Sequence, residues 1–250
     1  MIERQIDVTT TAGRMSTFAC HPERLGPHPI VIFFMDAPGI REELRDMARR
    51  LATVGYYVLL PNLYYRSKVE ELGQFIGADG AAVREKIMEL MASLTIPMVM
   101  DDTGALIAFA KSDDPASNGP IGCVGYCMSG QYAISAAAHY PDRVAAAASI
   151  YGTHLITDQP DSPHLAARRT KAKFYIACAE IDHYAPPEMI APLRQSLCEG
   201  GVNAEVELYP GVDHGFAFPQ RPTYDKAAAE RHWERLFALF ANALTLTERV

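Results

Sequence analysis

The chain has 250 residues, of which 49% are hydrophobic, and its formal net charge is -7 at pH 7. This length and composition are typical of one globular α/β domain over residues 1–250, and they exclude an intrinsically disordered chain. The acidic balance gives no electrostatic reason to bind nucleic acid or an anionic membrane, and we expect neither partner.

The five cysteines are scattered without the spacing of a disulfide framework or a zinc site. They predict reduced thiols and a cytoplasmic protein, and no metal or organic cofactor is implied. Residues 1–7 lack the apolar stretch of a secretory signal, and no apolar run is long enough to cross a bilayer. Cys123 and Cys178 lie in apolar runs and are interpreted as small core residues.

The predicted strands begin with an N-terminal stretch that alternates apolar and polar residues. This alternation, over residues 5–10 and 15–19, favours an antiparallel edge hairpin that turns near Ala12-Gly13. Six later apolar runs are mostly continuous, as in strands that are covered on both faces of a parallel sheet. These six strands are expected at 30–34, 57–60, 121–126, 144–150, 174–179 and 205–209.

Helical segments separate the predicted strands. Gly55 is a stop for the first helix, Asp79 is a candidate cap for the second, and Thr95 is a candidate cap for the third. Strand-helix alternation with right-handed crossovers predicts a doubly wound, mostly parallel sheet with helices on both faces. The weakly patterned residues 66–80 are expected to form a loop at the end of a strand. The expected helices span 42–54, 81–94, 97–110, 131–139, 187–198 and 223–244.

The most informative motif is the hexapeptide Gly125-Tyr126-Cys127-Met128-Ser129-Gly130, at the junction of a predicted strand and an Ala-rich helix. A reactive side chain between small residues at such a corner is typical of a nucleophile elbow. The helix that follows directs its N–H groups and the positive end of its dipole at the Cys127 sulfur, which favours the thiolate. The alternative interpretation is a buried, inert cysteine.

Three further polar residues, Asp36, Asp182 and His214, come directly after predicted strands, where open parallel sheets bind their ligands. His214 lies in a turn-rich loop, where a neutral imidazole could take the thiol proton and later activate water. Asp182 could accept the second ring proton of His214, and Glu180 is a rival with the same chemistry. Taken singly, each is as readily a surface histidine or a capping carboxylate.

The joint arrangement is more specific, because the order nucleophile, acid, histidine is that of α/β-hydrolases. On these residues the chain resembles the dienelactone hydrolase family (carboxymethylenebutenolidase-like), within the α/β-hydrolase fold, over nearly its whole length. The resemblance implies that Cys127 is the nucleophile, His214 the base and Asp182 its orienting acid. The matching stretches are residues 61–64, 125–130, 182–186 and 209–216.

The loop after the first main strand carries two more candidates. Asp36 stands where the family has a glutamate that contacts the resting thiol, and it is one methylene shorter; a simple loop carboxylate is the alternative. Ala37 has a backbone N–H, whereas Pro38 has none. Ala37 and Met128, the residue after the nucleophile, are therefore the candidate oxyanion-hole donors.

The chain departs from the family pattern at the elbow and in the substrate pocket. Ser129 stands where the family usually has glycine, and serine is still small. Members that cleave dienelactone hold the substrate carboxylate with arginines, one of them shortly after the catalytic histidine, where this chain has Phe218. Arg66 or the later Arg221 could substitute, although a solvated surface arginine is the simpler interpretation of Arg66.

Four aromatic residues suggest a more apolar or aromatic pocket, or else plain packing against the sheet; they are Tyr64, Tyr65, Phe216 and Phe218. The sequence as a whole predicts hydrolysis of a small ester or lactone through a thioester acyl-enzyme. Two alternatives stay open. One is acyl transfer or thioester hydrolysis on the same site, and the other is a non-catalytic small-molecule binder on the same fold. The oligomeric state is not determined by the sequence.

Overall fold

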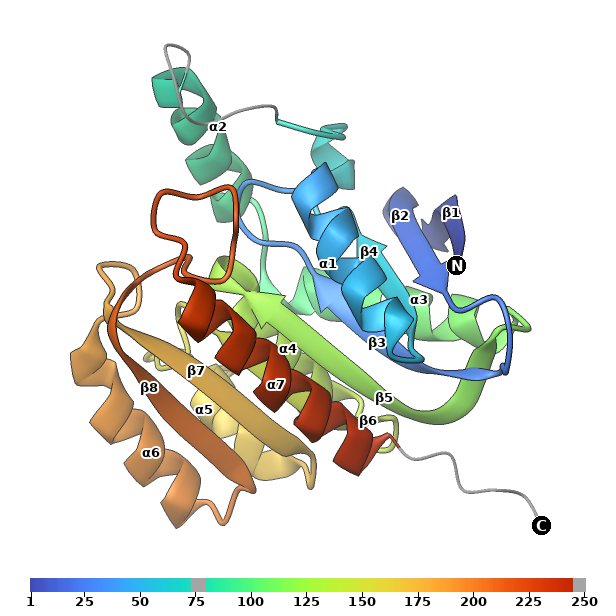
Figure 1. Ribbon diagram of the computed structural model, residues 1–250. Coiled ribbons are helices and arrows are strands. Elements are labelled where there is room, and N and C mark those ends of the chain that lie inside the picture. The colour runs from blue at the N-terminus through green and yellow to red at the C-terminus, as the bar shows by residue number, and fades with distance from the viewer. Residues whose placement is uncertain (73–79, 245–250) are drawn as a thin grey trace. The chain divides into compact units, whose positions relative to one another are not determined.

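The computed structural model describes residues 1–72 and 80–244. The chain divides into two units, Met1–Asn118 and Gly119–Val250, which are described separately (Figure 1). The single domain expected from the sequence stays a prediction. The candidate cap Asp79 lies outside the described residues.

The first unit opens with the expected antiparallel hairpin, β1 (Ile2–Thr10) and β2 (Gly13–His21). Strand β2 also pairs antiparallel with β4 (Tyr57–Pro61), which in turn pairs parallel with β3 (His28–Phe34). The strand order within this unit is therefore β1-β2-β4-β3. Strands β3 and β4 are almost wholly buried, as their continuous apolar sequences predict.

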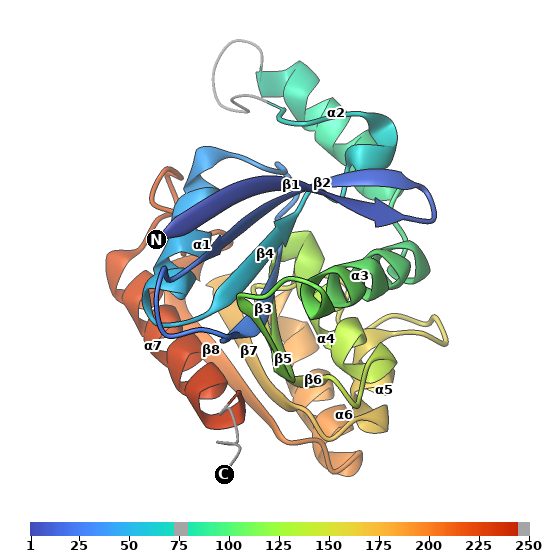
Figure 2. The ribbon, with the colours of Figure 1, turned by 90° about the vertical axis from the view of Figure 1, so that its right-hand side faces the viewer.

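Helices lie on both faces of these four strands. Helix α1 (Glu42–Thr53) covers one face and α3 (Ile96–Lys111) covers the other (Figure 2). The Thr95 side chain accepts the Met98 N–H, which confirms the predicted cap of α3. Two shorter helices complete the unit, η1 (Tyr65–Ser67) and α2 (Gly80–Ala92).

By length and composition, no single described helix could cross a membrane. Helices α2 and α3 pass that test only as a pair, with a bend of 81° between them.

The second unit contains four parallel strands in the order β5-β6-β7-β8. Helix α7 (Lys226–Ala243) lies on one face of them, while α4 (Gly130–His139), α5 (Pro163–Ala166) and α6 (Ile190–Glu199) lie on the other (Figures 1 and 2). This double covering explains why the sequences of β6 and β7 are apolar without alternation. The strands are β5 (Ala116–Tyr126), β6 (Val144–Ile150), β7 (Lys173–Ile181) and β8 (Ala204–Asp213).

The helix boundaries of this unit differ from expectation in three places. The last helix begins at Lys226 rather than near 223, because the Asp225 side chain accepts the Ala228 N–H at 2.8 Å and caps the helix there. The helix expected at 187–198 starts as a 3-10 turn, η4 (Pro187–Met189). Helix α5 and the short η3 (Ala167–Arg169) were not predicted, since helices of three or four residues carry too little periodicity to detect.

Candidate active site

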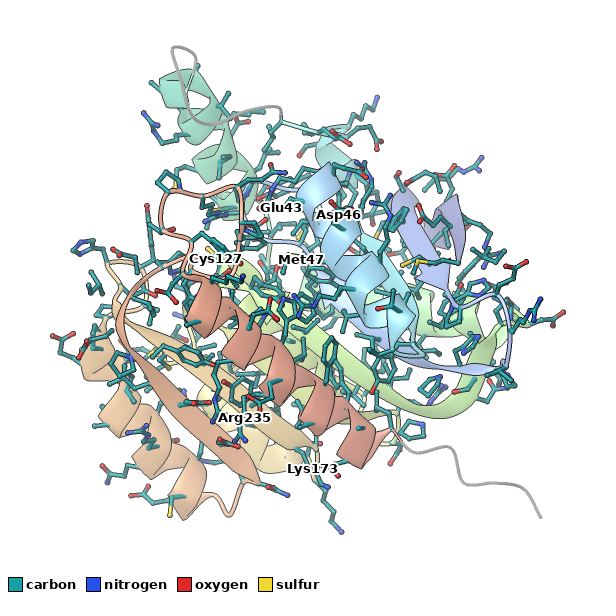
Figure 3. All side chains as sticks on the ribbon, in the orientation of Figure 1. Glu43, Asp46, Met47, Cys127, Lys173 and Arg235 are labelled. Atoms are coloured by element: carbon teal, nitrogen blue, oxygen red, sulfur yellow. The ribbon has the colours of Figure 1, made fainter. Side chains whose placement is uncertain are left out.

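The Cys127 backbone has the left-handed conformation of a nucleophile elbow. Strand β5 ends at Tyr126, Cys127 has φ = +55°, and a 3-10 turn, η2 (Cys127–Ser129), leads directly into α4. A non-glycine residue is strained at positive φ, and such strain persists only where the surroundings enforce it. Figure 3 shows Cys127 toward the end of the second unit where its strands finish, and Lys173, the first residue of β7, toward the opposite end.

Small residues on both sides of Cys127 make this corner possible. A Cβ atom added to Gly125 would lie 2.0 Å from the Ser129 carbonyl oxygen. One added to Gly130 would lie 2.3 Å from Ser149 Oγ, so α4 packs against β6 at a distance that only glycine allows. Ser129 is itself fully buried, so its hydroxymethyl group is accommodated within the elbow.

His214 and Asp182 form the contact that a catalytic pair requires. His214 Nδ1 is 2.8 Å from Asp182 Oδ2, and the two side chains are 8% and 0% exposed. The other carboxylate oxygen of Asp182 accepts the backbone N–H groups of Tyr184 and Ala185, both at 2.8 Å. These three bonds fix the carboxylate and leave His214 Nε2 as the ring atom that is available for chemistry.

The rival carboxylate at the end of β7 has a different partner. Glu180 accepts the Gly211 N–H at 2.7 Å and so links the end of β7 to the end of β8.

The charge state of His214 is set by its surroundings. Burial lowers the pKa of His214, but the hydrogen bond to Asp182 and the interaction with the Cys127 sulfur raise it by more. The net result is a pKa of about 9. His214 Nε2 is buried without a hydrogen bond of ordinary geometry. Its interaction with Cys127 is therefore one of proximity and charge. At neutral pH such an imidazole carries a proton.

The loop after β6 also contacts these residues, and sequence reasoning missed it. The Thr153 N–H donates to the Cys127 carbonyl at 3.0 Å. The Tyr151 ring lies 4.8 Å from the His214 ring, and the exposed Tyr184 ring lies 4.9 Å from it. Tyr151 directly follows β6, so a search of every strand end, polar or aromatic, could have found it.

In the first unit, Asp36 is part of a buried ion-pair network. Its carboxylate has no exposed surface, and its oxygens lie 2.5 and 3.2 Å from the two terminal nitrogens of Arg41. Arg41 also binds Glu43, at 2.8 Å, and the carbonyl of Gly39. Burial lowers the pKa of Arg41, but Asp36 and Glu43 raise it by more. Glu43 stands in the first turn of α1 (Figure 3).

Ala37, next along the chain, is held by Tyr64. The Tyr64 hydroxyl donates to the Ala37 carbonyl at 2.7 Å, and both residues are buried. A Cβ atom added to Gly39 would lie 3.4 Å from the Tyr64 ring, so that ring packs against the turn. Tyr64 thus contacts the backbone of the loop that carries the candidate oxyanion donor.

The two candidate substrate arginines both contact the protein itself. Arg66 donates to the two oxygens of Asp102 at 2.7 and 2.8 Å and stacks on the Tyr65 ring. Arg66 is therefore not the freely solvated arginine that was the simpler expectation. Arg221 stacks on the Phe218 ring, with its guanidinium carbon 4.7 Å from the ring centre.

Phe216 and Phe218 have no exposed surface. Phe216 stacks on Tyr209 at 4.8 Å, and Phe218 lies 5.4 Å from the Tyr126 ring. Their burial favours core packing, which was the alternative to a place in the substrate pocket.

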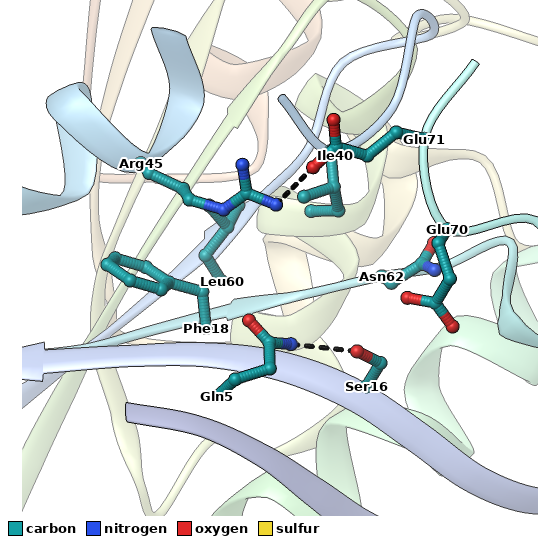
Figure 4. Close-up of a pocket in the computed structure, with 9 residues that line it drawn as sticks. All are labelled: Gln5, Ser16, Phe18, Ile40, Arg45, Leu60, Asn62, Glu70 and Glu71. Carbon is teal, nitrogen blue, oxygen red and sulfur yellow. Dashed lines mark hydrogen bonds and ion pairs between the residues drawn. The ribbon is translucent and has the colours of Figure 1, made fainter. Parts of the chain in front are cut away.

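A hollow of about 220 Å³ lies in the first unit, and its lining contains none of the proposed catalytic residues (Figure 4). Its apolar wall includes Phe18 and Leu60, and an ion pair joins Arg45 to Glu71 at its rim. The other lining residues are Gln5, Ser16, Ile40, Asn62 and Glu70. Within the described part of the chain, no group of three His, Cys, Asp or Glu side chains is arranged to hold a metal ion.

Comparison with solved structures defines the fold. A Klebsiella pneumoniae protein provisionally described as a dienelactone hydrolase superimposes with a TM-score of 0.85 and is 26% identical, covering 96% of this chain and 98% of its own. The carboxylesterase Cest-2923 of Lactobacillus plantarum superimposes with a TM-score of 0.68 at 14% identity, covering 99% and 100% of the two chains. The predicted α/β-hydrolase fold is thereby confirmed.

Sequence comparison defines the family within that fold. The profile of the dienelactone hydrolase family matches residues 15–244. A carboxymethylenebutenolidase of Pseudomonas putida is 30% identical over 213 residues, which are 84% of each chain. A Methylorubrum extorquens protein, provisionally named a carboxymethylenebutenolidase, is 27% identical over 94% of this chain and 79% of its own. The chain belongs to the dienelactone hydrolase family and is by class a carboxylic ester or lactone hydrolase.

Proposed function

We propose that the protein hydrolyses a small ester or lactone through Cys127 as nucleophile, His214 as acid and base, and Asp182 as the group that orients His214. The observation that carries this proposal is the contact between the fixed Asp182 carboxylate and His214 in the unit that also holds the strained Cys127. Strained backbone conformations such as that of Cys127 cluster at functional sites, so its positive φ supports a functional role for this thiol.

The first half of the reaction forms a thioester. The Cys127 thiolate attacks the carbonyl carbon, and the backbone N–H of Met128, with that of Ala37 proposed from its sequence position, stabilises the oxyanion. The carbon–oxygen bond to the leaving group then breaks, and His214 gives its proton to the departing oxygen. The raised pKa of His214, about 9, supports this order, because the imidazole is already protonated at neutral pH.

The second half regenerates the enzyme. Neutral His214 takes a proton from water, the resulting hydroxide attacks the thioester carbon, and the carboxylic acid leaves as the Cys127 thiolate reforms. In a lactone the leaving oxygen stays attached to the acyl group, so one hydroxy acid is the product. The role of Asp36 as a contact of the resting thiol remains a proposal that rests on family resemblance.

Substitution of the nucleophile tests this proposal. We expect Cys127→Ala to lower turnover of a small aryl ester roughly 10⁴-fold or more, since the covalent route is lost. Cys123→Ala is the matched control: Cys123 is fully buried in β5, burial raises its pKa, and turnover should persist. Mass spectrometry of the quenched wild-type enzyme should detect the acyl group on Cys127. Wild-type turnover in Cys127→Ala would refute the assignment, and transfer of the acyl group to added alcohols in preference to water would indicate an acyltransferase.

We also propose a cytoplasmic location. All five cysteines are free, and Cys198 is exposed, which suits a reducing compartment.

A further inference from the structure

A buried histidine outside the proposed triad contacts the residue directly before the nucleophile. His232 lies on α7, has no exposed surface, and its Nε2 is 3.0 Å from the Tyr126 hydroxyl. Its Nδ1 contacts the carbonyl of Ala229, which can only accept, so Nδ1 carries the hydrogen. In the neutral ring Nε2 is then an acceptor, and the Tyr126 hydroxyl donates to it.

Tyr126 is in a position to control the geometry of the elbow. It is the last residue of β5, and the φ = +55° of Cys127 follows immediately. Strain of this kind needs rigid neighbours to hold it. The Tyr126 ring is packed 5.4 Å from Phe218 and 5.9 Å from Tyr151.

The same aromatic packing reaches the proposed base. The Tyr151 ring lies 4.8 Å from the His214 ring, and it also contacts Phe218 at 6.2 Å. The proposed nucleophile and its proposed base are thus attached to one set of rings, and His232 is a member of that set that binds Tyr126 by a hydrogen bond. An aromatic ring in a packed cluster can still tilt slightly, whereas a ring whose hydroxyl is bound at a fixed atom is more restricted.

We infer that His232 is a positioning residue, whose hydrogen bond to Tyr126 sets the direction in which the Cys127 sulfur faces His214. The inference rests on the proposed function, because it takes Cys127 as the nucleophile. Helix α7 thereby contributes to the reaction as well as covering one face of the strands.

A pair of substitutions separates positioning from stability. His232→Phe keeps a ring but removes the nitrogen that accepts from the Tyr126 hydroxyl. Loss of this buried hydrogen bond should lower the melting temperature. The double variant Tyr126→Phe/His232→Phe removes both polar groups, and its melting temperature should return close to that of the wild type. We expect its kcat on the aryl ester to stay on the order of 10-fold or more below wild type with KM little changed, because small misplacements of reacting groups are costly.

Two further measurements make the test specific. The rate at which iodoacetamide labels Cys127 should fall in parallel with kcat, and it reports on the thiol without requiring ester hydrolysis. His232→Gln places an amide oxygen near the position of Nε2, so it should recover most of the lost kcat. Tyr175→Phe is the control: it removes a buried hydroxyl that is 2.6 Å from the Tyr209 hydroxyl, near the start of β7. It should lower the melting temperature and leave kcat unchanged.

Two results would overturn the inference: recovery of kcat and labelling rate along with the melting temperature in the double variant, or a His232→Gln variant no better than His232→Phe. Failure of the proposed function would look different, since Cys127→Ala would then retain turnover. In that case only the rate at which iodoacetamide labels Cys127 tests the positioning role. An unchanged labelling rate in His232→Phe would refute it.

Discussion

The loops that follow β5 and β3 both carry proposed catalytic groups, yet different forces hold them. The loop after β5 is shaped by sterics, because Gly125 and Gly130 have no room for a Cβ atom and Cys127 is forced to φ = +55°. The loop after β3 is held by charge, because the buried Asp36 is bound by Arg41, which Glu43 also binds. Close packing fixes the position of the Cys127 backbone accurately. The loop after β3 depends instead on Arg41, because removing one partner of a buried ion pair leaves the other charge uncompensated.

The largest effect that would sharpen this comparison is expected at His214, beside the sterically shaped loop. His214→Gln should lower turnover roughly 10²- to 10⁴-fold, because the general acid and base is lost. It should also slow iodoacetamide labelling of Cys127 at pH 7 by roughly 30-fold, because an unassisted cysteine is only a few per cent thiolate at that pH. An unchanged labelling rate would show that His214 does not activate the thiol.

The same variant gives a prediction for pH. The pKa of His214 is raised to about 9 in the folded protein, above its usual value of 6.5. The folded state therefore binds the proton more tightly, and the stability this contributes is complete below about pH 6.5 and is lost as the pH rises through 9. The melting temperature of the wild type should fall more steeply than that of His214→Gln between these two values, and parallel curves would contradict the shift.

An intermediate effect is expected at Arg41, in the loop held by charge. Arg41→Met removes the cation from Asp36 and Glu43, which are both buried, and should lower the free energy of unfolding by about 3–5 kcal/mol. Arg45→Met is the matched control, because its partners Glu42 and Glu71 are exposed, and it should cost about 1 kcal/mol or less. Urea unfolding of the two variants measures the difference, and equal losses would show that the buried network has no special weight.

The smallest effect is expected at Tyr64. Tyr64→Phe removes the hydrogen bond to the Ala37 carbonyl and should lower the free energy of unfolding by about 0.5–1.5 kcal/mol. If Ala37 is an oxyanion donor, kcat should fall as well. Tyr65→Phe removes a comparable buried hydroxyl, bound to Asp102, and should lower stability without lowering kcat. Equal kcat in the two variants would argue against a role for the Ala37 loop in the reaction.

Much of the site could be predicted from local patterns. The elbow is a short motif whose small residues are required by the backbone around them, so Cys127 could be found without knowing its neighbours in space. Asp182 and His214 could be placed because the carboxyl ends of parallel strands meet at one edge. The N-terminal hairpin and the main strands followed from alternation and from continuous apolar runs.

Other features depend on residues that are distant in sequence, and no local pattern indicates them. The choice between Asp182 and Glu180 as the partner of His214 depended on how the ends of β7 and β8 meet. There Glu180 accepts the Gly211 N–H, and Asp182 contacts His214. Likewise, the sequence did not show whether the Arg66 side chain is solvated or bound. Its partner, Asp102, lies on α3, 36 residues further along the chain.

By itself, the sequence determined the fold class, the family and the thiol at the elbow, because hydrophobic periodicity and a short strained turn are local properties. Only the tertiary structure decided which side chains are bound to one another. It brought His232 of α7 to Tyr126, 106 residues away in the chain, and it buried Phe216 and Phe218 in the core. Hydrogen bonds and close packing depend on distance in space, and only the folded chain brings residues that are far apart in the sequence within that distance.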